Sequence, residues 1–396
     1  MARLLFLILA MPVFFDTGNF SLYLQKIEGI DFYKNHPSLL VPLSILPFIY
    51  LIVHSYILRL QNIVHERIIL NFKEIVLVVM FLILNIKSSL STFLISIAIL
   101  LLPFFYSVFD KIPGRHIRNI EYFFYGTILF VLMHFLHYFS LFEGTPIYFE
   151  ELGSFFGYKI HQSLVAYPSS MNMTLIFILT KIFVNNNEIK NASVPSSNIL
   201  LDIFFAIVLA YIIILRKNAP ISEALIFFLL KIFMDFYFKR IFGLTLTITI
   251  SAILIFYFDA HLILIDWYEV LKNIESSNRA EALKIGLSRI NLKEIIFGSF
   301  SDRNYSGSHN LFIDILYRGG VISLAIFLII FSIFFKKILN NISVMTCNSE
   351  RLIIFLSLVL FLIVSSSVNS NLTQIIFIVK LIFVFFYILN KDRKFK

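Results

Sequence analysis

Long apolar stretches separated by polar segments constrain this chain more than any other feature. A helix needs about 20 mostly apolar residues to cross a bilayer, and we find twelve candidate stretches of that kind. They cover residues 3–20, 38–58, 68–86, 89–109, 120–142, 165–184, 197–215, 219–238, 241–259, 309–335, 352–369 and 372–390. The sequence therefore predicts an all-α polytopic integral membrane protein with about 12 transmembrane helices.

The composition agrees with this class. Of the 396 residues, 59% are hydrophobic and only 14% are charged, so the chain lacks the charged surface that a soluble protein of this length needs. The formal net charge of +9 does not predict a nucleic-acid partner, because basic residues in membrane proteins mainly set orientation. The single cysteine, Cys347, excludes a disulfide within the chain and argues against a thiolate metal site. We expect neither a metal nor a cofactor.

Lysine and arginine are distributed unevenly between the two sides of the predicted membrane. With both termini in the cytoplasm, the cytoplasmic segments carry 18 of these residues and the short outer segments carry 6. This bias predicts cytoplasmic N- and C-termini. Two larger loops, 143–164 and 260–308, then face outward, and we treat residues 1–396 as a single membrane domain. The apolar run from Leu4 to Phe15 has no small-residue cleavage site after it, so we expect it to belong to the first spanning helix.

The second outer loop holds the largest set of polar side chains. Its segment ESSNRAEALKIGLSRI, residues 275–290, has the pattern of an amphipathic helix that Ser277 or Asn278 would cap. Its basic residues are Arg279, Lys284 and Arg289. One interpretation, which applies to Arg289 in particular, is that these residues only contact anionic lipid head groups.

A turn-rich segment, FGSFSDRNYSGSHN, follows at residues 297–310. His309 would lie in the first turn of the next helix, where free backbone N–H groups and the helix dipole favour anions such as phosphate. The same field disfavours a cationic imidazole, so a neutral His309 would be available as a proton acceptor, although a bound phosphate would act in the opposite direction. The alternative is a partly exposed histidine at the membrane interface.

Arg318 follows His309 by nine residues, which places the two on roughly opposite faces of one straight helix. They share a site only if another segment completes it or if the helix begins later. Asp314 precedes Arg318 by four residues, so a simple ion pair is the alternative role of this arginine. The adjacent Gly319 and Gly320 would allow close packing or a bend.

Residues 275–330 resemble the core domain of the O-antigen polymerase and O-antigen ligase superfamily. In that family, an outer loop with an arginine leads through a Phe-Gly turn and a His-Asn or His-Ser pair to a glycine pair in a spanning helix. The corresponding pattern here is NRAEAL…IIFGSF…SHNLFIDILYRGGVISL. The residues that carry the resemblance are Arg279, Gly298, His309, Asn310, Gly319 and Gly320.

The resemblance implies a metal-independent glycosyl transfer at the periplasmic face of the bacterial inner membrane, from a glycan on undecaprenyl diphosphate. His309 is then the candidate base that activates the acceptor hydroxyl. Arg279 and Arg318 are candidate ligands of the diphosphate, because a guanidinium group forms paired hydrogen bonds to phosphate oxygens. The other candidate substrate-binding residues of this segment are Asn310, Arg289 and Arg303.

The earlier outer loop departs from the family pattern. The family often has an arginine there, before a Pro-Asn-type motif, whereas this chain reads GYKIHQSLVAYPSS. Lys159 stands where we expect the arginine, and Ser169 follows Pro168. A lysine binds phosphate as a point charge without the paired geometry of arginine. Lys159 and His161 are therefore further candidates for substrate binding.

Three functions are compatible with these features. A polymerase would transfer the growing glycan onto another lipid-linked repeat unit, with a chain-length regulator protein as a possible partner, and a ligase would transfer it to lipid A-core. The Phe-, Ile-, Asn- and Lys-rich composition is typical of AT-rich polysaccharide gene clusters and favours the polymerase. A flippase for the same lipid-linked sugar is the third, because charges lie inside predicted spans and transporters use such charges.

The charges inside predicted spans are Asp202, Glu223, Lys231, Asp235 and Lys380. Lys231 and Asp235 are four residues apart, which predicts a structural ion pair on one helix face. Lys380 has no acidic partner in its own predicted helix. We expect it to pair with Asp202 or Glu223, with a contact to the lipid diphosphate as the alternative.

Overall fold

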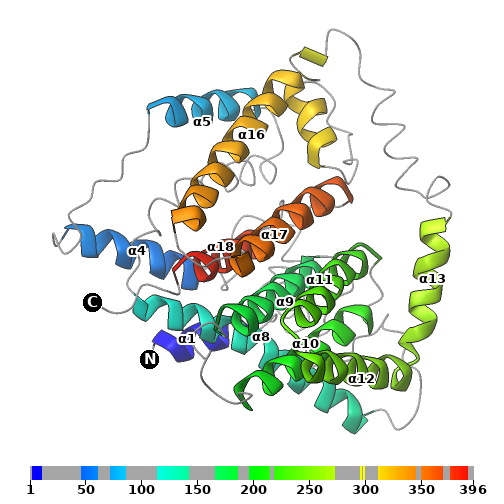
Figure 1. Ribbon diagram of the computed structural model, residues 1–396. Helices are drawn as coiled ribbons and strands as arrows, with labels where there is room; N and C mark the ends of the chain where they lie inside the picture. The colour runs from blue at the N-terminus through cyan, green and yellow to red at the C-terminus, as the bar shows by residue number, and fades with distance from the viewer. Residues whose placement is uncertain are drawn as a thin grey trace, which may run out of the picture. The chain divides into compact units, whose positions relative to one another are not determined.

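The computed structural model describes residues 2–10, 46–60, 72–85, 114–141, 166–185, 196–214, 218–272, 295–296, 298, 311–344, 349–368 and 375–390. Within these ranges all regular structure is helical, which confirms the all-α prediction for this part of the chain (Figure 1). The helices are α1 (Ala2–Leu9), α4 (Leu46–Leu60), α5 (Phe72–Asn85), α8 (Gly114–Leu141), α9 (Ala166–Asn185), α10 (Ser196–Ile214), α11 (Asn218–Tyr237), α12 (Ile241–Tyr257), α13 (Ala260–Lys272), α16 (Leu311–Val344), α17 (Ser349–Val368) and α18 (Ile375–Asn390).

Eleven of the twelve predicted apolar stretches overlap one of these helices, and the stretch 89–109 lies outside the described residues. The exception to the prediction is α13, which occupies the start of what the sequence predicts to be the second outer loop. Its first six residues, AHLILI, are mostly apolar and continue a helical pattern in which Ala260 and Ile263 are buried. This apolar run is too short for a span, so the sequence alone assigns it to the outer loop that begins at residue 260.

Among the described residues, no single helix is long and apolar enough to cross a bilayer. One pair passes this test together, namely Ile241–Tyr257 with Ala260–Asp266, which are bent by 91° at the break between them. Shorter apolar helical segments are Met171–Phe183, Ile199–Ile214, Gly319–Ile333 and Leu352–Ile363.

The chain divides into two compact units, and each is described by itself. Unit 1 comprises Met1–His54, Pro113–Ile265 and Arg393–Lys396, and unit 2 comprises Ser55–Ile112 and Asp266–Asp392. In unit 1, α9 packs against α8, α10 and α11, while α10 packs against α12 and α1 against α8. Every residue of α9 from Met171 to Thr180 is buried, which is the pattern of a central helix. Phe124 of α8 and Phe177 of α9 stack with their ring centroids 4.4 Å apart.

Helix α12 has an unusual distribution of side chains. Its buried residues are Gly243, Thr247 and Ser251, which recur every four residues on one face. Several of its large apolar residues are instead exposed, with Ile241 70% and Ile253 59% accessible. The hydroxyl of Thr247 donates to the carbonyl oxygen of Gly243 at 2.9 Å, so it is satisfied within its own helix. Small residues on the buried face allow α12 to approach α10 closely.

In unit 2, α16 packs against α5, α17 and α18. The ring of Phe327 lies 6.3 Å from that of Phe81 and 5.1 Å from that of Phe331, between ring centroids. Helix α16 is interrupted at Gly320, whose backbone has φ 70° and ψ −172°. This confirms the bend that the Gly319–Gly320 pair predicts. Gly298 also has a positive φ of 81°, as a turn at the Phe-Gly sequence requires.

We predict that Gly320→Ala lowers the stability of the protein because φ 70° with ψ −172° is a region open almost only to glycine. The expected loss is about 1–3 kcal/mol in the free energy of unfolding. Gly319→Ala is the matched control, because Gly319 is buried in the same helix without a positive φ. Thermal unfolding of both variants in detergent, followed by circular dichroism, measures the difference. Equal melting temperatures would show that the kink does not depend on the glycine backbone.

Candidate functional site

The residues that the sequence predicts to bind substrate lie mostly outside the described part of the chain. This applies to His309, Arg279, Arg289, Arg303, Asn310, Lys159 and His161. Only Arg318 belongs to a described element, and its backbone lies in α16 two residues before the kink at Gly320. The assembly of these eight predicted residues into one site therefore stays a prediction.

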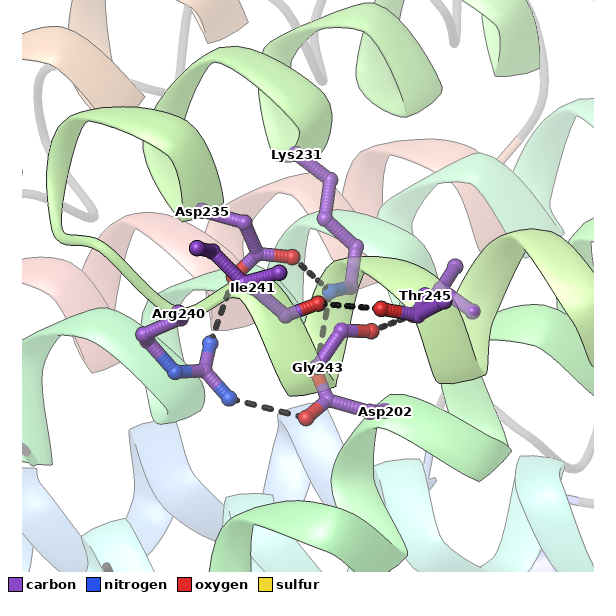
Figure 2. Close-up of polar contacts among 8 residues, drawn as sticks. Asp202, Lys231, Asp235, Arg240, Ile241, Gly243 and Thr245 are labelled. Carbon is purple, nitrogen blue, oxygen red and sulfur yellow. Dashed lines mark hydrogen bonds and ion pairs between the residues drawn. The ribbon is translucent and has the colours of Figure 1, made fainter.

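The structure does bring together a set of buried charges in unit 1. They are Asp202 of α10, Lys231 and Asp235 of α11, and Arg240 in the turn before α12, and we call them the four-charge cluster (Figure 2). The Lys231 Nζ atom lies 2.9 Å from Asp202 Oδ1 and also donates to Asp235 Oδ2. Arg240 donates one N–H group to Asp235 Oδ1 and another to Asp202 Oδ2, both at 2.8 Å. Each carboxylate thus contacts both cations in a closed ring.

Burial makes this pairing necessary. The side chains of Asp202, Lys231 and Asp235 are at most 1% exposed, and that of Arg240 is 15% exposed. Removing a charge from water costs several kcal/mol unless a partner and further hydrogen bonds compensate it. Two acids and two bases sum to a formal charge of zero, so the cluster is neutral as a whole. The prediction of a structural Lys231–Asp235 pair is confirmed.

A tight turn between α11 and α12 places Arg240 in the cluster. Lys239 has φ 55°, and its backbone N–H donates to the carbonyl oxygen of Phe236 at 3.1 Å. The next N–H, that of Arg240, donates to the carbonyl oxygen of Asp235 at 2.7 Å. The chain therefore reverses within three residues, and the guanidinium group of Arg240 reaches back to the carboxylate of Asp235.

Gly243 is required because α10 and α12 meet at the cluster. A Cβ atom on this residue would lie 2.7 Å from Asp202 Oδ2 and 3.1 Å from the Nη2 atom of Arg240. Both distances are shorter than ordinary van der Waals contact, so any side chain would displace the ion pair between these residues. The glycine therefore permits the carboxylate of α10 and the guanidinium group before α12 to pair directly beside the α12 backbone.

Aromatic rings surround the cations of the cluster. The Nζ atom of Lys231 lies 5.6 Å from the ring centroid of Phe205. The guanidinium carbon of Arg240 lies 5.3 Å from the ring centroid of Phe183, at the end of α9. Such contacts stabilise a cation through the negative face of the ring. They also exclude water and leave the carboxylates as the strongest partners of Lys231 and Arg240.

Two further polar contacts connect the helices of unit 1. Near one end, Lys181 of α9 pairs with Glu121 of α8 at 3.3 Å and donates to the hydroxyl of Tyr125. Near the opposite end of α9, the amide of Asn172 donates to Glu223 of α11 at 2.8 Å. Among the described residues, no group of three His, Cys, Asp or Glu side chains could hold a metal ion.

The sequence identified the charges but not all of their partners. Asp202 contacts Lys231 and Arg240, and Glu223 accepts from Asn172, whereas the sequence predicts Lys380 as the partner of one of these acids. Lys380 is buried in α18 of unit 2, and its proposed ion pair stays a prediction. In the predicted topology Arg240 is one of the 18 lysine and arginine residues of the cytoplasmic segments. Arg240 follows Asp235 by five residues across a short turn, and this spacing is the sequence signal that could have predicted their ion pair.

The chain was compared with protein-family models, with curated proteins and with solved structures, and none of them matches.

We predict that Asp202→Ala destabilises the protein strongly, because it leaves Lys231 and Arg240 to share one carboxylate in a buried position. Breaking a buried pair on one side costs about 3–5 kcal/mol. The double variant Asp202→Asn/Lys231→Met retains the neutral Arg240–Asp235 pair and is expected to lose less. Glu269→Gln, at an exposed acid of α13, is the control. Chemical unfolding in detergent gives the three free energies. If the double variant were less stable than Asp202→Ala, the loss of stability would not come from an unbalanced buried charge.

Proposed function

We propose that this chain is a polytopic integral membrane protein of the bacterial inner membrane, with about twelve spans and cytoplasmic termini. The observation that carries the membrane assignment is the side-chain distribution on α12. Its buried residues are Gly243, Thr247 and Ser251, and its exposed residues are mostly large and apolar. A helix in water would bury the opposite face.

A second example lies at the end of α11 and in the cluster beside it. Phe236 of α11 is 77% exposed, whereas Asp202, Lys231 and Asp235 are buried. Large apolar side chains exposed in this way favour a contact with lipid or with another protein. Lipid supplies that contact along the whole surface, and polar or small residues between the helices supply the specific packing. The distribution therefore supports a protein whose exterior faces hydrocarbon.

The proposed orientation separates the four-charge cluster from the predicted catalytic loop. The contacts of Lys181 with Glu121, and of Arg240 with Asp202 and Phe183, bring together the starts of α8, α10 and α12 and the ends of α9 and α11. With cytoplasmic termini, this end of the bundle is the cytoplasmic end. The second outer loop leaves from the other end of α12. The cluster therefore acts in our proposal as a structural connection, and its closed pairing gives a flippase no free charge there.

Within this membrane frame we propose glycosyl transfer by a polysaccharide polymerase. His309 takes the proton of an acceptor hydroxyl on a lipid-linked repeat unit while that oxygen attacks the anomeric carbon of the growing glycan. The bond from that carbon to undecaprenyl diphosphate breaks, and the diphosphate leaves. Arg279, with Arg318 or Lys159, neutralises the charge that develops on it. The resemblance of residues 275–330 to the polymerase and ligase superfamily supports this proposal, and the kink at Gly320 agrees with its glycine pair.

We predict that His309→Ala abolishes polymer formation, because loss of a general base lowers the rate about 100- to 10,000-fold. The measurement is a lipopolysaccharide gel from cells that lack the gene and carry the wild type, His309→Ala or Arg279→Ala. Arg118→Ala is the matched control, because Arg118 is exposed on α8 near the proposed cytoplasmic end. A full ladder from His309→Ala at normal membrane levels would overturn the catalytic role of this histidine.

The strain without the gene also separates the three functions. A band of core plus one repeat unit indicates a polymerase. Bare core with accumulated lipid-linked polymer indicates a ligase. Bare core without repeat units on the periplasmic side of the membrane indicates a flippase.

A further inference from the structure

Four large side chains form one exposed stripe along α11. The stripe consists of Leu229, Phe233, Phe236 and Tyr237, each of them more than half exposed. All four lie on one face of the helix, because they recur at intervals of three or four residues. The rings of Phe233 and Tyr237 stack with their centroids 6.3 Å apart. The stripe is therefore continuous, and its aromatic residues lie in the last turns of α11.

The charges of α11 lie on the other side of the helix. Lys231 and Asp235 each follow a member of the stripe by two residues, which places them roughly opposite to it, in the four-charge cluster (Figure 2). Arg240 belongs to the same cluster, and two of its N–H groups donate to carboxylates. The cluster is neutral and closed, so its charges are already compensated inside the bundle.

Lys239 supplies an exposed charge beside the stripe. It lies in the turn between α11 and α12, where φ 55° and a backbone hydrogen bond of 3.1 Å to the last turn of α11 hold its backbone. Within the described residues no acid pairs with it. From residue 203 to residue 258 the acidic residues of the chain are Glu223 and Asp235, and both are buried. The exposed charge at this turn is therefore positive.

The turn also lies at the end of an uncharged segment. Between Arg240 and Asp259 the chain has no charged residue, so in the proposed membrane frame α12 enters hydrocarbon directly after the turn. Phe242, in the first turn of α12, is 61% exposed. Tyrosine is enriched at the boundary between lipid and water, where its ring contacts apolar groups and its hydroxyl reaches water. This frame places Tyr237 and Lys239 at the level of the lipid head groups.

We propose that the α11–α12 turn is a contact site for an anionic phospholipid of the cytoplasmic leaflet. The ammonium group of Lys239 binds the lipid phosphate, while Phe236, Tyr237 and Phe242 pack against the glycerol and the first carbons of the acyl chains. The apolar stem of a lysine can lie along such groups and keep its charge at the head group. This inference rests on the proposed membrane function and adds to it the class of lipid that this turn selects.

Charge favours an anionic lipid over the other possible occupants of this surface. A zwitterionic lipid carries a positive group of its own, which offsets the attraction of Lys239 for its phosphate. A second copy of the chain, bound through the same surface by two-fold symmetry, would bring two Lys239 side chains to one interface without an exposed acid to compensate them. An anionic lipid instead matches a positive charge next to an aromatic surface.

Quenching of a single tryptophan by brominated lipids tests this site. The only tryptophan, Trp267, is first replaced by phenylalanine, and one tryptophan is then introduced by Tyr237→Trp beside the turn. Ile253→Trp, at an exposed apolar position of α12 far from the turn, is the matched reference. The full chain is reconstituted in mixtures of phosphatidylglycerol and phosphatidylcholine in which one of the two lipids is brominated. The dependence of quenching on the lipid ratio gives the relative affinity for the two lipids at each tryptophan.

We expect the Tyr237→Trp variant to prefer phosphatidylglycerol about fivefold, as one lysine near an anionic lipid surface provides. Addition of Lys239→Gln is expected to abolish this preference, whereas Lys239→Arg retains it and raised salt weakens it. The Ile253→Trp variant is expected to show no preference, because both lipids present the same acyl chains there.

The remaining outcomes separate this inference from the membrane proposal. Equal affinity for the two lipids in the Tyr237→Trp variant, or a preference that Lys239→Gln leaves unchanged, would overturn the lipid site. Quenching of the Ile253→Trp variant alone would show that protein, such as a second copy of the chain, covers the stripe. That result would overturn the inference and leave the membrane proposal intact, whereas absence of quenching in both variants would overturn both.

Discussion

The four-charge cluster is the interaction on which the arrangement of α10, α11 and α12 depends. Four charged groups are buried together, and Asp202 meets its partners Lys231 and Arg240 only when the three helices stand in their observed register. Asp202 comes from one helix, Lys231 and Asp235 from the next, and Arg240 from the turn that follows. A shift of one helix along another would leave a charge without its partner in a medium of low dielectric constant.

This requirement explains the sequence around the cluster. The turn at Lys239 reverses the chain within three residues, so Arg240 returns to Asp235. Gly243 leaves the space in which the side chains of Asp202 and Arg240 meet. The hydroxyl of Thr247 donates to the carbonyl oxygen of Gly243 in its own helix, so it needs no hydrogen-bond partner from another helix. Polar pairing thus specifies how these helices pack. The exposed large apolar residues of α12 lie on the outside, where they would contact lipid in the proposed function.

The regular structure was largely predictable from the sequence, because apolar stretches of helical length are a strong local signal. The bend in α16 was also predictable, since paired glycines remove the steric barrier to an unusual backbone. Helix α13 was not predicted, because its polar residues resemble those of the loop that follows. The Lys231–Asp235 pair followed from a spacing of four residues, whereas the contacts of Asp202 with Lys231 and Arg240 join residues 29 and 38 positions apart.

The sequence by itself determined that the described part of the chain is helical, where most of its helices lie, and which buried charges need partners. It also supplied the candidate residues for glycosyl transfer, including His309 and Arg279, through a resemblance that lies mainly outside the described residues. Only the tertiary structure decided that two acids and two bases close into one ring and that α13 turns away from α12 at Asp259. The physical reason is that helix formation depends on neighbours within a few residues, whereas ion pairing and helix direction depend on which segments meet in space.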